Sequence, residues 1–271
     1  MDTSARKRKL VVATIYPYEL LARQLVGAGV EVQTLIPPSA SPHTWTPRPS
    51  DLKAIREATL VISNGLGLET QLQQALRDAG DKHVCVAELL GWEQPKALDR
   101  QAAGTNPHVW LSPRLLSQAT LQLSRRLQES LPELGDAIGN NALKVLSGLA
   151  ALHERITSER SALERTPVIT YHDSFHYFFQ EYGIDYLGSI QSSPGREPNP
   201  RELSALGDLI RKSQVKAICV EPQMERKSAQ VLASEFGLRI IELDPLGTTF
   251  QPQAITDVIL GNWEALRKGW Q

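Results

Sequence analysis

The stretch Thr166-Pro-Val-Ile-Thr-Tyr-His172-Asp-Ser-Phe-His-Tyr177 decides how this chain is interpreted. Its first half is a β-branched and aromatic run, which is typical of a buried strand. The run ends at His172, and Asp173 or Ser174 is expected to cap a helix that begins at Phe175. A histidine therefore stands at the carboxyl end of a strand, where open α/β sheets place their ligands.

Three more side chains that can bind a metal follow predicted strands or stand in proline-framed loops. They are His43, shortly after Val-Gln-Thr-Leu-Ile-Pro-Pro, His108 in Asn-Pro-His-Val-Trp-Leu, and Asp244 in Glu-Leu-Asp-Pro-Leu-Gly. A neighbouring proline stiffens the backbone at each of the three. Along the sequence, these residues and His172 follow one another at intervals of about two strand–helix units. This is the spacing expected of ligands that come from successive parts of an α/β fold. We therefore expect these three residues and His172 to surround one metal ion.

Simpler interpretations apply to several polar residues. His83 and His153 are expected to be surface or hydrogen-bonded histidines, and Asp244 could simply stabilise a turn. His176 lies four residues after His172 and would share a helix face with it if both were helical. We expect His176 to border or support the site, or else to be structural, and Asn106 and Glu221 are two further candidates for a bordering or supporting role.

Composition is ordinary for a soluble globular protein. The chain has 271 residues, 41% of them hydrophobic, and 29 basic against 30 acidic residues, for a net charge of −1. No basic excess favours nucleic acid, and no apolar run approaches the ~20 residues of a membrane-spanning helix. Cys85 and Cys219 lie inside apparent strands and are expected to be small buried apolar residues.

The pattern of apolar runs predicts an α/β fold with two similar lobes. Eight short runs predict strands: 9–15, 30–36, 59–63, 83–87, 168–171, 185–190, 215–220 and 238–243. Helical patterns lie between them: 18–26, 50–57, 68–79, 112–130, 175–182, 200–212, 228–236 and 255–270. Such alternation predicts a mostly parallel four-stranded sheet in each lobe, covered by helices on both faces.

A long helical pattern with one apolar stripe separates the two sets of strands. We predict a leader or loose segment at residues 1–9, an N-terminal lobe at 10–133, one long connecting helix at 134–164 and a C-terminal lobe at 165–271. A helix of that length acts as a stiff connection. Two predicted ligands come from each lobe, so the metal site is expected between the lobes.

Three imidazoles and one carboxylate form a set that suits tetrahedral Zn²⁺. Manganese prefers more oxygen ligands, which makes Mn²⁺ the second choice, whereas copper and nickel also bind imidazoles well. Affinity is expected to fall as the histidines protonate.

Several segments resemble motifs of the ZnuA-like family, the metal-binding proteins of bacterial ABC uptake transporters. They are Pro37-Pro-Ser-Ala-Ser-Pro-His43-Thr-Trp-Thr-Pro-Arg-Pro-Ser-Asp-Leu52, Ser63-Asn-Gly-Leu-Gly-Leu-Glu69, Asn106-Pro-His108-Val-Trp-Leu-Ser-Pro113, Glu197-Pro-Asn-Pro-Arg-Glu-Leu203 and Glu242-Leu-Asp244-Pro-Leu-Gly247. The resemblance runs from about Leu10 to the C-terminus.

This resemblance implies a periplasmic or surface-tethered receptor with two α/β lobes joined by one long helix. Such a receptor is not an enzyme; it captures a transition metal and hands it to a membrane permease. The family's ligand positions fall on His43, His108, His172 and Asp244. Manganese-type members usually carry glutamate where His172 stands, so the resemblance places this chain among the zinc binders. We expect a monomer whose signal peptide has been removed and is absent from this sequence.

The chain departs from the family pattern at three places. Asn106 stands where aspartate is frequent, so a carboxylate that supports the site is missing. His176 stands where relatives often have a small residue. Residues 88–107, predicted as a surface loop, contain no histidine, unlike the His-rich loop of some zinc binders.

Three other functions fit parts of the pattern. One is a manganese or broad-specificity metal receptor. Another is a zinc hydrolase, in which Glu221 at a strand end would be the general base beside an open metal position. The last is an adhesin or interaction module that uses the fold without its ligands.

Overall fold

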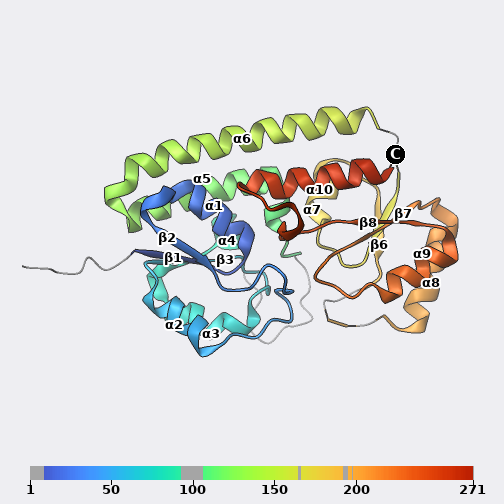
Figure 1. The fold of residues 1–271 in the computed structure, drawn as a ribbon, viewed down its shortest axis with the longest axis horizontal. Coiled ribbons are helices and arrows are strands. Elements are labelled where there is room, and N and C mark those ends of the chain that lie inside the picture. The colour runs from blue at the N-terminus through green and yellow to red at the C-terminus, as the bar shows by residue number, and fades with distance from the viewer. Residues whose placement is uncertain (1–8, 93–105, 164–165, 192–194, 197, 271) are drawn as a thin grey trace, which may run out of the picture.

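A computed structural model describes residues 9–92, 106–163, 166–191, 195–196 and 198–270. The predicted leader, apart from Lys9, and residues 93–105 of the predicted surface loop lie outside the described residues. Two α/β lobes lie next to each other along the long axis of the molecule, and helix α6 (Gly135–Ser161) runs beside both of them (Figure 1).

Each lobe is built on a four-stranded sheet in which every neighbouring pair is parallel. The strand order is β2-β1-β3-β4 in the N-terminal lobe and β6-β5-β7-β8 in the C-terminal lobe, so the two lobes repeat one topology. The strands are β1 (Leu10–Ala13), β2 (Glu31–Thr34), β3 (Leu60–Ser63), β4 (His83–Cys85), β5 (Val168–Thr170), β6 (Tyr186–Ser189), β7 (Ala217–Val220) and β8 (Arg239–Glu242). The predicted fold class is confirmed.

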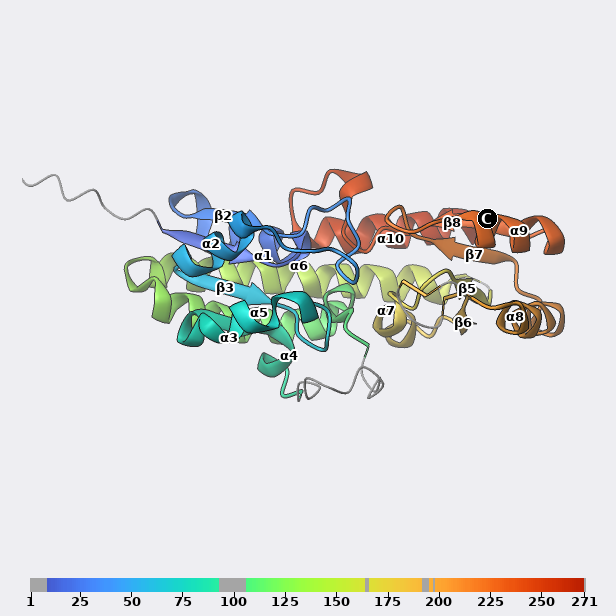
Figure 2. The same ribbon diagram turned by 90° about the horizontal axis from the view of Figure 1, so that it is seen from below.

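Helices cover both sheets (Figures 1 and 2). In the N-terminal lobe they are α1 (Tyr16–Val26), α2 (Pro49–Glu57), α3 (Gln73–Asp78), α4 (Val86–Leu89) and α5 (Pro113–Ser130). In the C-terminal lobe they are α7 (His176–Glu181), α8 (Pro200–Ser213), α9 (Lys227–Phe236) and α10 (Ile255–Trp270). Short 3-10 helices are η1 (Gly27–Gly29), η2 (Thr70–Leu72), η3 (Gly80–Lys82), η4 (Val109–Leu111), η5 (Pro132–Leu134) and η6 (Thr248–Phe250). Among the described residues, no helix qualifies as a membrane span by its length and hydropathy.

The helix predicted at 175–182 begins differently from the expectation. Its N-cap is Phe175, and no side chain caps it, so the prediction that Asp173 or Ser174 would do so is wrong. The Ser174 hydroxyl instead donates to Glu221 Oε1 at 2.8 Å. A hydrogen bond to a buried carboxylate has therefore displaced the local cap.

The helix predicted at 68–79 also begins later, as η2 followed by α3. Leu66 and the glycines on either side of it have positive φ. The chain therefore makes a left-handed turn there, and Leu68 N donates back to Gly65 O at 3.1 Å. The turn brings Glu69 into the lobe, where it is 4% exposed.

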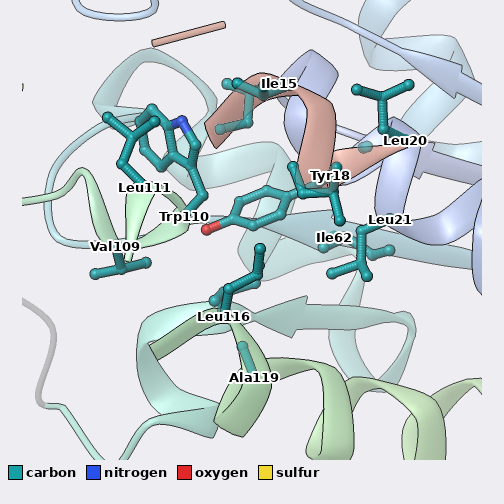
Figure 3. Close-up of a cluster of buried hydrophobic side chains, with 14 of the residues drawn as sticks. Ile15, Tyr18, Leu20, Leu21, Ile62, Val109, Trp110, Leu111, Leu116 and Ala119 are labelled. Atoms are coloured by element: carbon teal, nitrogen blue, oxygen red, sulfur yellow. The ribbon is translucent and has the colours of Figure 1, made fainter. Parts of the chain in front are cut away.

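The segment that follows His108 is anchored in the core of the N-terminal lobe. Val109, Trp110 and Leu111 are each 1% exposed. Trp110 lies beside Tyr18 of α1 (Figure 3), with ring centroids 6.2 Å apart in an edge-to-face arrangement. Edge-to-face aromatic pairs are favourable beyond the area they bury. Helix η4 thus fixes the backbone on which His108 sits.

The two lobes are tied by more than the predicted connecting helix. Helix α10 begins next to the N-terminal lobe, where Ile255 N donates to Gln24 Oε1 at 2.9 Å. It then runs beside α6 (Figure 1), and Trp263 Nε1 donates to Glu159 Oε2 at 2.6 Å. The largest hydrophobic core contains residues of both lobes and of both helices. Helix α10 is therefore a second tie between the lobes, which the sequence patterns did not reveal.

Both cysteines are free and buried, as predicted. Burial raises the pKa of Cys85 to about 11 and that of Cys219 to about 12. The thiolate is the form that binds metals and reacts, so both residues act as small apolar side chains.

Candidate metal centre

His43, His108 and His172 meet in one cluster. His43 lies in the loop after β2, His108 precedes η4, and His172 follows β5. One ring nitrogen from each lies within 4.8 Å of the other two, and the Nε2 atoms of His43 and His108 are 3.3 Å apart. Among the described residues this is the only group of metal-binding side chains that meets this criterion. His43 and His172, the first and last of the three, are 129 positions apart in the sequence (172 − 43). The fold therefore brings together residues that are distant along the chain.

Asn106 orients the imidazole of His108. Its Oδ1 lies 2.8 Å from His108 Nδ1 and accepts from His108 N at 3.0 Å. An amide oxygen is only an acceptor, so Nδ1 carries the proton and Nε2 presents its lone pair to the cluster. Asn106 Nδ2 also donates to the carbonyl of Asp173 in the other lobe. An aspartate could not make that second bond, so asparagine both orients His108 and joins the lobes.

Glu221 orients the imidazole of His172 in the same way. Its Oε1 lies 3.2 Å from His172 Nδ1 and accepts from Ser174 Oγ at 2.8 Å. Both Glu221 and His172 are 5% exposed. A carboxylate behind a histidine fixes the tautomer and raises the basicity of the nitrogen that faces the metal. Glu221 is thus engaged with His172, which does not suit the general base of the hydrolase hypothesis.

Both lobes line the pocket that contains the three imidazoles. The residues around the histidines and Glu221 are Ser41, Pro42, Trp110, Gln223, Met224, Pro245 and Leu246. Trp110 Nε1 donates to Pro245 O at 2.8 Å across the lobes. Gln71 Nε2 donates to Pro42 O at 3.0 Å from outside the pocket.

Asp244, the fourth predicted ligand, is fully buried but lies outside the group of clustered ring nitrogens. Its Oδ1 accepts from three donors, Gln223 Nε2 at 2.8 Å and Leu246 N and Gly247 N at 3.0 Å. Its Oδ2 accepts from Thr248 Oγ1 at 2.6 Å and Thr249 N at 2.8 Å. The carboxylate therefore stabilises the turn after β8, and its role as a ligand stays a prediction.

The other histidines lie apart from the cluster. His176 has a 43% exposed side chain 3.5 Å from Asp173 Oδ2, and it does not line the pocket. His83 Nε2 is 2.7 Å from Ser63 Oγ. His153 Nδ1 is 2.8 Å from Glu181 Oε1. His153 Nδ1 also lies 3.2 Å from the Tyr182 hydroxyl, so both His83 and His153 have hydrogen-bond partners, in agreement with the prediction.

Asn64 and Glu69 support the loop that carries His108. In the sequence they stood out only as part of the motif at residues 63–69. Asn64 Nδ2 donates to Pro107 O at 2.8 Å, next to His108. Glu69 Oε1 accepts from Asn64 N and from Thr14 Oγ1, both at 2.7 Å. Burial is the main cause that raises the pKa of Glu69. This buried network holds the loop that carries His108.

Burial also shapes the charge of the cluster. It is the largest cause that lowers the pKa of His43 to about 3, and the nearby His172 adds to the effect. Burial, followed by His172 and His43, holds the pKa of His108 well below 6.5. The two imidazoles are neutral at pH 7, the form that binds metals. Their converging lone pairs suit a cation.

The metal-free protein is expected to lose stability as the pH falls from about 6.5 towards 3. The folded state holds His43 and His108 neutral, whereas the unfolded chain takes up protons near the ordinary pKa. The unfolded state then binds more protons, so stability is complete above about pH 6.5 and falls by up to about 1.4 kcal/mol per pH unit for each histidine. Urea unfolding with a chelator at several pH values measures this slope.

A His43→Gln variant should lose part of that slope, whereas His176→Gln should keep it, because the His176 side chain is 43% exposed. An unchanged slope in His43→Gln would show that this imidazole is not held neutral by the fold.

Two α/β lobes with a cluster of imidazoles between them define a solute-binding protein for a metal ion. Comparison with known proteins identifies the family. The chain matches the ZnuA family, described as the periplasmic component A of a zinc-uptake complex, over residues 11–269. It therefore belongs to this family of metal-binding proteins of ABC uptake systems, and such proteins are not enzymes.

Individual relatives agree with the family assignment. A protein of Thermotoga maritima is 32% identical over 262 residues, covering 96% of this chain and 92% of that one. The high-affinity zinc uptake system protein ZnuA of Bacillus subtilis is 28% identical over 274 residues, covering 95% and 86%. The manganese-binding lipoprotein MntA of Bacillus subtilis is 28% identical over 228 residues, covering 83% and 74%. A crystal structure of ZnuA superimposes with a TM-score of 0.82 at 25% identity, covering 96% and 98%.

Proposed function

We propose that this chain is the zinc receptor of an ABC importer, and that it captures Zn²⁺ in the pocket between the lobes and delivers it to a membrane permease. The convergence of the His43, His108 and His172 ring nitrogens within 4.8 Å carries the proposal. Zinc binds three imidazoles readily and takes a fourth ligand to complete a tetrahedron. The sequence predicts Asp244 as that ligand, and the pocket lies beside Pro245 and Leu246, which follow it.

The ligand type favours zinc over manganese. Affinity for nitrogen ligands rises from Mn²⁺ to Zn²⁺, and manganese prefers oxygen. His172 supplies a nitrogen where a carboxylate would favour manganese, and Glu221 is turned towards His172 Nδ1. The similarity to MntA, named for manganese, keeps a manganese or broad-specificity receptor as the second candidate.

Competition between the two metals tests the proposal. Metal-free protein is dialysed against Zn²⁺ with an excess of Mn²⁺ on the order of 100-fold, and bound metals are counted by elemental analysis. We expect one zinc per chain and almost no manganese, because the nitrogen-rich cluster prefers zinc. Equal occupancy by manganese would favour the broad-specificity alternative. No bound metal at neutral pH would reject a metal receptor altogether.

A further inference from the structure

We propose that Gln223 is a metal-binding residue: its side-chain oxygen supplies the fourth donor of the site, and Asp244 anchors and polarises its amide. This inference rests on the proposed function and assigns the predicted ligand Asp244 a different role. Gln223 follows β7 and lines the pocket that contains the three imidazoles.

The orientation of the Gln223 amide follows from its neighbours. The Nε2 group lies 2.8 Å from Asp244 Oδ1 and 3.2 Å from the carbonyl of Pro38 in the other lobe. Both neighbours are acceptors only, so the nitrogen must face them and the oxygen must point elsewhere. Gln223 Oε1 is buried, and no donor among the described residues lies within hydrogen-bonding distance. A buried carbonyl oxygen at a pocket needs an electropositive partner.

Asp244 is poorly placed to be the donor itself. Its two oxygens accept five hydrogen bonds, four of them from groups of the turn that follows it. A carboxylate offers about four lone-pair sites, so binding a cation would require Asp244 to give up existing bonds. Gln223 Oε1 can bind one without any such loss.

The hydrogen bond from Gln223 to Asp244 also polarises the Gln223 amide. Hydrogen bonds in series polarise one another, so an N–H donated to a carboxylate makes the carbonyl oxygen of the same amide more negative. Glu221 acts in a comparable way behind His172. The bond from Gln223 Nε2 to Pro38 O also ties this donor to the loop that leads to His43. Residues of both lobes thus hold this one side chain in place.

Zinc affinity of a Gln223→Met variant tests the inference, measured by competition with a chromogenic chelator. Methionine keeps the length and volume but removes both the oxygen donor and the N–H. We expect a loss of affinity on the order of 10- to 100-fold, the range seen when groups that support a metal site are removed. The visible spectrum of bound Co²⁺ should change as well, because it responds to the donor set. If Asp244 is the ligand instead, removing its competing donor leaves affinity unchanged or raises it.

Gln71→Met is the matched control. Gln71 donates to Pro42 O of the same loop but does not line the pocket. It should keep the wild-type Co²⁺ spectrum and nearly the wild-type affinity. Equal losses in both variants would mean that Gln223 only holds the loop, which would overturn the inference. If wild-type protein itself binds no zinc, the proposed function fails, whereas wild-type binding with an unaffected Gln223→Met variant refutes the inference alone.

Discussion

A His108→Ala variant is expected to bind zinc at least about 100-fold more weakly than the wild-type protein, because removing even a group behind a metal ligand costs about 10- to 100-fold. His108 is 3% exposed, and its Nε2 lies 3.3 Å from that of His43. Alanine leaves two imidazoles and opens a space that water can enter. Competition with a chelator at neutral pH measures the loss.

His83→Ala provides the matched control for this experiment. His83 bonds to Ser63 Oγ and lies outside the cluster, so zinc affinity should stay at the wild-type value. Retention of full uptake function by His108→Ala in cells would contradict the receptor and favour an interaction module. A loss of affinity in both variants would indicate a general disturbance of the N-terminal lobe.

The three clustered histidines were predictable from sequence because the topology of a parallel sheet determines where the ends of its strands lie. Parallel strands end at the same edge of their sheet, and His172 directly follows β5. The proline-framed loops that carry His43 and His108 indicated the same edge. Long-range position therefore followed from local patterns, without knowledge of side-chain contacts.

The residues that hydrogen-bond around the site were less predictable from sequence than the three histidines themselves. Asn106 was expected to leave the site without one supporting carboxylate, yet its amide oxygen lies against His108 Nδ1 and its amide nitrogen reaches Asp173 of the other lobe. Gln223 follows a strand but carries no feature of charge or spacing that marks it in sequence. Its importance depends on where Pro38 and Asp244 lie, 185 and 21 residues away. Such contacts are set by how the lobes meet, which no local pattern records.

The second tie between the lobes was missed for a similar reason. The periodicity of α10 correctly predicted an amphipathic helix, but periodicity does not identify the partner of the apolar face. The structure packs α10 against α6 and against α1. Helix α10 therefore stabilises the arrangement of the lobes, and its central aromatic residue is where that contribution can be tested.

Truncation of that residue, Trp263→Ala, should lower the free energy of unfolding of the metal-free protein by about 3–5 kcal/mol, the usual cost for a buried tryptophan. Trp263 is fully buried, contacts Phe178 and Trp270 through its rings, and donates from Nε1 to Glu159 Oε2. Truncation leaves a cavity where α10 meets α6 and the C-terminal lobe. Urea unfolding followed by circular dichroism measures the change.

Two further variants separate packing from hydrogen bonding at this position. Trp263→Phe keeps a ring but removes the N–H, so it should lose less stability than alanine, with about 1 kcal/mol due to the hydrogen bond. Trp270→Ala removes a half-buried tryptophan from the same helix and should also cost less. Zinc stoichiometry should stay at one in all three variants, because neither tryptophan lines the pocket. If Trp263→Ala lowered the free energy of unfolding by less than about 1 kcal/mol, α10 would not hold the lobes together. Removal of a tightly packed side chain has a larger effect on stability than that.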